Sequence, residues 1–146
     1  MSDEDLLRRV KDLEDRVDNL ETIEYSKIYF TVLNNTTGKQ WSTALTRSSA
    51  DDGLIDLSSA FGVPANVQAV IVRLFMHDSD ASPPVALCKM GPSSPAGEAF
   101  FYASPAYTDE WIPYTTFVSC DANGDIYISF SESIDGLYFD IIGYVI

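Results

Sequence analysis

Apolar residues near the N-terminus recur at alternating spacings of four and three residues. Leu6, Leu13 and Leu20 lie seven residues apart, and Val10 and Val17 lie between them. Placing Val at position a and Leu at position d gives an unbroken heptad pattern. The apolar stripe is confined to a and d, which is typical of a coiled-coil seam and narrower than the face of a globular-protein helix. The pattern predicts a coiled-coil stalk over residues 1–24; a surface helix packed on its own head domain is the alternative.

Charged residues flank this seam in a repeated order. The form Arg-apolar-x-x-apolar-Glu occurs at residues 9–14 and again at 16–21. It resembles the short trimerisation motif of three-stranded coiled coils, in which Arg packs over the core and pairs with Glu. Val at a with Leu at d favours a dimer instead. We therefore expect a parallel homotrimer, with a dimer as the alternative. The predicted trimerisation residues are Leu6, Arg9, Val10, Leu13, Glu14, Arg16, Val17, Leu20 and Glu21.

From Ile28 onwards the apolar period drops towards two, and β-branched and aromatic residues become frequent, which predicts β-strands. Turn residues separate these segments, notably Asn123-Gly124 and Asp135-Gly136. With no helical pattern among the strands, the sequence predicts an antiparallel, jelly-roll-like β-sandwich head over residues 25–146. The candidate strands are 26–33, 40–46, 53–56, 67–77, 85–90, 99–103, 112–120, 125–131 and 137–146.

Composition and charge exclude several partners. The 146 residues include 9 Lys and Arg against 22 Asp and Glu, giving a net charge of −13. Such a chain lacks the basic footprint that nucleic acids and anionic membranes require, so we expect neither as a partner. No apolar run reaches the roughly 18 residues of a transmembrane helix. The acidic start has no apolar core of a secretory signal, so we expect no signal peptide.

Acidic residues form two arrangements that resemble functional sites in part. Asp121 and Glu132 have the spacing of a calcium-binding EF-hand loop, but Ile126 stands where that loop needs glycine. An Asn123-Gly124 turn is the simpler interpretation. The adjacent pairs Asp51/Asp52 and Asp109/Glu110 are candidate carboxylates for glycoside hydrolysis. Adjacent acids arise readily by chance among 22, so we expect most of them to be solvated.

The only histidine also lies in a polar segment, His77-Asp78-Ser79-Asp80. A Ser-His-Asp hydrolase needs a nucleophile on an exposed turn, and no Gly-x-Ser-x-Gly elbow is present. We interpret the segment as the polar end of a strand. We expect the two cysteines, Cys88 and Cys120, to be free thiols; a single disulfide between them is the alternative. The sequence therefore predicts no catalytic residue, no metal site and no cofactor, and a protein that is not an enzyme.

Aromatic residues gather beside carboxylates in one further segment. Tyr107, Asp109, Glu110 and Trp111 are candidate ligand-binding residues, because tryptophan beside carboxylates recurs in sugar-binding surfaces. The alternative is that these aromatic side chains fill the sandwich core or an interface between subunits. Both interpretations remain open at this point.

The stretch from Asp56 to Leu74 reads DLSSAFGVPANVQAVIVRL. It resembles a segment of small β domains in virion proteins of tailed bacteriophages. The segments 123–127 and 142–145 resemble the last hairpin and the closing strand of that module. A short coiled coil feeding a compact β head is also the usual plan of trimeric viral fibres, spikes and decoration proteins. Cellular trimers with C1q-like heads share this plan, but they are exported.

The resemblance implies a non-enzymatic structural protein of the virion, made in the host cytoplasm, whose partners are other capsid or tail proteins. We expect a capsid decoration (cement) protein or a head spike, because the chain starts almost directly at the coil and lacks the anchoring domain usual in tail fibres. The alternative is a receptor-binding tail fibre tip that recognises host surface glycan through loops of the head.

Overall fold

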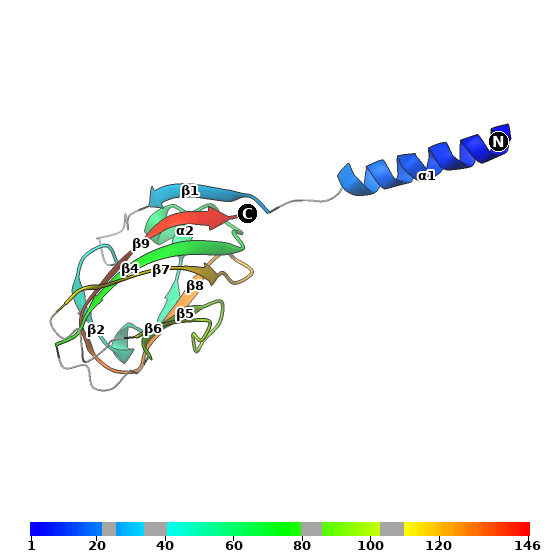
Figure 1. The fold of residues 1–146 in the computed structure, drawn as a ribbon. Helices are drawn as coiled ribbons and strands as arrows, with labels where there is room; N and C mark the ends of the chain where they lie inside the picture. The colour runs from blue at the N-terminus through cyan, green and yellow to red at the C-terminus, as the bar shows by residue number, and fades with distance from the viewer. Residues whose placement is uncertain (22–25, 34–40, 80–85, 103–109) are drawn as a thin grey trace.

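The computed structural model describes residues 1–21, 26–33, 41–79, 86–102 and 110–146, except for the side chains of 17–21 and 86–87. It has two parts, a helix and a β head, and the helix lies apart from the head (Figure 1). Helix α1 spans Asp3–Glu21. Its first turn carries three acids, which suit the positive end of the helix dipole. The predicted end of the stalk at residue 24 lies outside the described residues.

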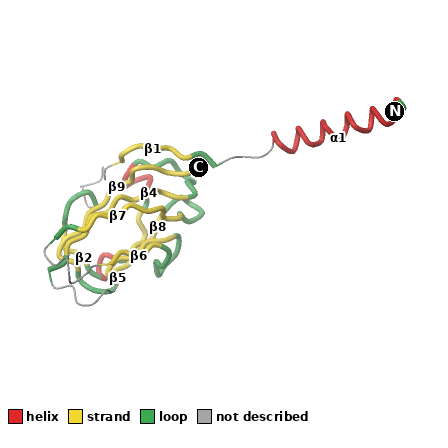
Figure 2. Tube along the Cα trace, viewed as in Figure 1, coloured by secondary structure: helices red, strands yellow, loops and turns green. Residues whose placement is uncertain are grey.

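The head consists of two antiparallel sheets (Figures 1 and 2). The larger sheet has the order β1-β9-β4-β7, and β2 pairs with the first half of β9. The smaller sheet has the order β3-β8-β5-β6. From β4 to β9 the chain passes repeatedly between the sheets, which confirms the predicted mainly β, sandwich-like fold. The strands are β1 (Ile28–Leu33), β2 (Leu45–Arg47), β3 (Gly53–Ile55), β4 (Ala69–His77), β5 (Ala86–Gly91), β6 (Ala99–Tyr102), β7 (Ile112–Ser119), β8 (Ile126–Phe130) and β9 (Ile134–Val145).

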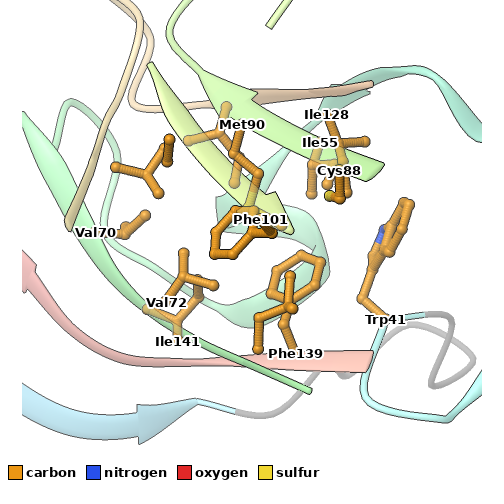
Figure 3. Packing of buried hydrophobic residues seen from close by; sticks show 14 of the residues in the cluster. Trp41, Ile55, Val70, Val72, Cys88, Met90, Phe101, Ile128, Phe139 and Ile141 are labelled. Carbon is orange, nitrogen blue, oxygen red and sulfur yellow. The ribbon is translucent and has the colours of Figure 1, made fainter. Parts of the chain in front are cut away.

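The core lies between the two sheets and is built by alternate residues of each strand. In β4, every second residue from Val70 to Met76 is fully buried, as expected for a strand with one face on a core. Phe139 of β9 lies centrally, with ring centroids 5.2 Å from Phe61 and 5.5 Å from Trp41. Figure 3 shows Val72 and Phe139 of the larger sheet and Met90 and Phe101 of the smaller sheet pointing into the space between the sheets. Burial of each such side chain contributes roughly 1.5–3 kcal/mol.

Two parts of the strand prediction are wrong. The segment between β3 and β4 contains a short helix, α2 (Leu57–Phe61), where no helix was predicted. The predicted strand 40–46 is replaced by β2, which begins at Leu45, and Gln40 lies outside the described residues. Trp41 turns into the core instead, and its carbonyl accepts a hydrogen bond from the Phe139 amide at 2.7 Å. Burial of the large indole decides the conformation there.

The two predicted turns have different outcomes. Asn123-Gly124 forms a turn, in which the Asp121 carboxylate accepts hydrogen bonds from the amides of Asn123 and Asp125, both at 2.9 Å. Gly124 has φ 87°, a backbone conformation that favours glycine. The predicted turn is therefore confirmed, but it joins β7 of one sheet to β8 of the other, so the hairpin that the resemblance implies for this segment does not form. The predicted Asp135-Gly136 turn is wrong, since both residues lie within β9.

Candidate functional site

The apolar seam of α1 is exposed in the single chain. Leu6, Val10 and Leu13 keep 50%, 43% and 56% of their surface accessible. The charged positions Arg9, Glu14 and Arg16 are exposed as well. The side chains of Val17, Leu20 and Glu21, which were also predicted to contribute, lie outside the described residues.

The start of the head is tied to the C-terminus of the chain. The amide of Lys27 donates to the Ile146 carbonyl at 2.9 Å, and the amide of Ile146 donates back to the Lys27 carbonyl at 3.0 Å. The amide of Gln68, next to β4, donates to the Val145 carbonyl at 2.8 Å. The point at which the chain enters the head is therefore fixed to the central strands of the larger sheet. We call this the stalk end of the head.

The outer face of the larger sheet, away from the core, carries an apolar row. Phe30 of β1 pairs with Gly143 of β9, Gly143 pairs with Ile71 of β4, and Ile71 pairs with Phe117 of β7. Residues paired in register project from the same face of a sheet. The neighbours of Ile71, Val70 and Val72, are core residues, so this row faces outwards. Phe30 is 77% exposed and Phe117 is 52% exposed.

Glycine at position 143 lets the middle of this row pack closely. A Cβ atom there would lie 2.7 Å from the Tyr29 carbonyl oxygen and 2.9 Å from Cδ1 of Ile71. Ile71 occupies that space and is only 5% exposed, although it points away from the core. Two exposed aromatic side chains, Phe30 and Phe117, therefore lie on either side of a closely packed centre.

The predicted ligand-binding group is only partly described. Tyr107 and Asp109 lie outside the described residues. Glu110 is exposed, and Trp111 is 45% exposed at the end of β4 opposite the stalk end. The Trp111 ring lies 5.4 Å from the His77 ring and 5.5 Å from the Tyr138 ring. Trp111, His77 and Tyr138 thus form an aromatic cluster, which we call the Trp111 platform.

Sequence reasoning missed Gly136 as part of this platform. A Cβ atom on Gly136 would lie 2.7 Å from Cη2 of Trp111, so only glycine leaves room for the indole there. The Asp135-Gly136 dipeptide predicted a turn. Glycine is needed there for a different reason, because the Trp111 side chain packs closely against β9.

The polar segment at the end of β4 is hydrogen-bonded to β9. The Asp135 carboxylate accepts a hydrogen bond from the Ser79 amide at 2.9 Å and a second, short one from the Ser79 hydroxyl. These two bonds lower the pKa of Asp135 below its usual value. The serine hydroxyl is thus directed at a carboxylate on β9. This geometry fits the interpretation of the segment as the polar end of a strand.

Of the two candidate pairs, Asp51 and Asp52 make structural hydrogen bonds. Asp51 accepts from Arg47 at 3.3 Å and from the Ser48 amide at 3.0 Å, and Asp52 accepts from the Phe130 amide at 2.7 Å. Within the residues that the structure describes, no three His, Cys, Asp or Glu side chains gather to hold a metal.

Both cysteines are free thiols, as predicted. Cys88 is buried in the core, and burial raises its pKa well above the usual range. Burial, and to a lesser extent the negative charge of Asp121, raises the pKa of Cys120 to about 12. Neither thiol is ionised near neutral pH, so neither is an activated nucleophile.

The three segments that carry the resemblance meet at the stalk end. Asp56 caps α2 by accepting from the Ser59 amide at 2.8 Å, and the Asp125 carboxylate accepts from the Leu57 amide at 3.0 Å. Asn66 has φ 63°, and its amide donates to the Asn123 carbonyl at 3.3 Å. The segment 142–145 runs beside the start of β4. These contacts therefore bring the three segments together at the stalk end of the head.

Comparison with known proteins gave no match among protein-family models, curated proteins or solved structures. Among the described residues, no helix has both the length and the apolar character needed to cross a membrane.

Proposed function

We propose that three copies of this chain associate through α1 into a homotrimeric structural protein of a tailed-phage virion, acting as a capsid decoration protein or head spike. The apolar seam of α1, which the single chain leaves exposed, carries this proposal. A lone 19-residue helix of this charge density is marginal in water. Burial of Leu6, Val10 and Leu13 against the same residues of two further copies supplies the missing stability. Arg9 of one copy then faces Glu14 of its neighbour.

A trimer of this kind acts by binding alone. Three identical heads raise the avidity of weak contacts without any strong single site, and binding stabilises the capsid by mass action. The trimer carries three times the charge of −13. That charge keeps free trimers apart and requires a basic or mainly apolar docking surface on the capsid. Threefold symmetry also suits the threefold and quasi-threefold positions of a capsid.

The test is to locate the protein on the particle. An antiserum raised against the purified chain is applied to particles of the phage that encodes it, and the label is imaged by electron microscopy. We expect label over the capsid, which is lost from particles that carry Val10→Asp in the seam. Particles that carry Lys11→Asp, on the outward face of the same helix, keep the label. Particles without label on capsid or tail contradict the proposal.

A second candidate function is glycan recognition by a fibre tip, and the Trp111 platform favours it. An exposed indole beside Glu110, at the opposite end of the head from the stalk, is suited to stacking on a sugar ring. On an array of bacterial surface glycans, Trp111→Ala should abolish binding, while Phe100→Ala on the smaller sheet should not. Label on the tail together with this loss would favour the fibre tip over the decoration protein.

A further inference from the structure

We propose that the outer face of the larger sheet is the surface through which the heads of neighbouring copies pack against one another. The occupant of this face is a second copy of the chain. The inference rests on the proposed trimer and names the surface that continues the contact from the stalk into the head.

The chain path favours this sheet over the smaller one. Seven Cα steps separate Glu21, the last residue of α1, from Ile28, the first residue of β1. Seven residues reach at most about 25 Å when extended. Parallel coiled-coil helices end together, so three β1 strands begin within that reach of the threefold axis. Lys27 is hydrogen-bonded to Ile146, so this end of the larger sheet is held within the same reach of the axis as β1.

The side chains on this face suit burial against another protein surface. Phe30 and Phe117 project from strands on either side of Ile71, and all three are apolar. Two large aromatic side chains that are more than half exposed on one sheet face mark a candidate interaction surface. Aromatic side chains are also enriched in the buried centres of interfaces between subunits.

The charge on this face permits contact between identical copies. The chain carries a net charge of −13, so most of its surface would repel a second copy. On the outer face of the larger sheet, Arg73 and Asp140 form an ion pair at 2.9 Å and cancel. The smaller sheet carries Lys89, whose Nζ lies 5.9 Å from the Phe100 ring centre. Packing of three copies through that face would bring their three Lys89 ammonium groups together.

The rate at which a cysteine introduced on each sheet reacts with a maleimide shows which sheet face is covered in the oligomer. Thr115→Cys lies on the outer face of the larger sheet, in register with Arg73, and Leu54→Cys is an exposed position on the smaller sheet. The full chain is treated with a maleimide at neutral pH, where Cys88 and Cys120 contribute a slow background. We expect the thiol at position 115 to react at least tenfold more slowly than the thiol at 54 in the oligomer.

A pair of matched substitutions tests the same face by its effect on assembly. Phe117→Asp places a carboxylate in the apolar row of the larger sheet. Phe100→Asp places one on the exposed face of the smaller sheet and serves as the control. Sedimentation of the full chain should show the concentration of half-dissociation rise at least tenfold for Phe117→Asp and stay unchanged for Phe100→Asp. An oligomer in which the two thiols react equally, or in which Phe117→Asp has no effect, overturns the inference and leaves the trimer standing. A monomeric parent chain overturns both.

Discussion

The guanidinium of Arg73 donates a hydrogen bond to the carboxylate of Asp140 at 2.9 Å, across the central strands β4 and β9. The two residues are also paired in the strand register. Their bond fixes the alignment of the two longest strands, because a slip of one residue would separate the charges. It also leaves the outer face of the larger sheet without a net charge near the apolar row.

Removing the charge of Asp140 should weaken the fold. Asp140→Asn keeps the size of the side chain but leaves the Arg73 charge on a largely apolar face. Since Arg73 is still partly exposed, we expect the free energy of unfolding to fall by about 1–2 kcal/mol. Urea denaturation followed by tryptophan fluorescence measures this loss. The exposed Glu132→Gln should change stability by less than about 0.5 kcal/mol; equal effects would refute the role of the pair.

The close approach at Gly143 gives a second prediction. A methyl group there meets the Tyr29 carbonyl oxygen at 2.7 Å, and the backbone cannot yield cheaply. Gly143→Ala should therefore lower the free energy of unfolding by roughly 1–3 kcal/mol. At Gly97 a Cβ atom would meet nothing within 4 Å, so Gly97→Ala serves as the control. A Gly143→Ala protein as stable as the parent would rule out the tight packing of β1 on β9.

The cap of α2 makes stability depend on pH in the acid range. Hydrogen bonds from the Ser59 amide and the Ser58 hydroxyl lower the pKa of Asp56 below its usual 3.8. The folded pKa lies below the unfolded one, so this stabilisation is complete above pH 3.8 and is lost as the pH falls through the folded value. Acid unfolding monitored by circular dichroism should lose this component in Asp56→Asn, which keeps a capping side chain. Asp56→Ala should in addition lower the thermal midpoint at pH 7.

The sequence predicted the strands well wherever the apolar period was two and one face was buried. The alternation of buried and less buried residues along β4 and β8 follows directly from that period. Helix α2 escaped detection because five residues are too few to show a helical period. Its only signals were local: Asp56 as the cap, Ser58 and Ser59 after it, and Gly62 with φ 73° at its end. Such signals also mark ordinary turns.

The candidate surfaces were harder to predict than the strands. The seam of α1 is visible in the sequence because its period is local. The apolar row of the larger sheet is not, because its residues come from β1, β4 and β7, which lie far apart along the chain. The platform around Trp111 depends on a long-range contact with Gly136 that no local pattern encodes.

The substitution Val10→Asp in α1 tests whether the head folds without the assembly of the stalk. Val10→Asp places a charge at position a, where three copies would bury it together, and should abolish the oligomer. The head has its own core, so its near-ultraviolet circular dichroism should persist. Lys11→Asp, one residue further and facing outwards, should leave assembly intact. Loss of the head signal in Val10→Asp would show that the head depends on the stalk for folding.

The mass of the purified full chain in solution tests the central claim most directly. Multi-angle light scattering should give three times the chain mass of 16.1 kDa over a wide range of concentration. A mass of two chains would mean that the dimer favoured by Val at a with Leu at d forms instead, and it would contradict the threefold arrangement. A particle of 16.1 kDa at every concentration would contradict the account as a whole.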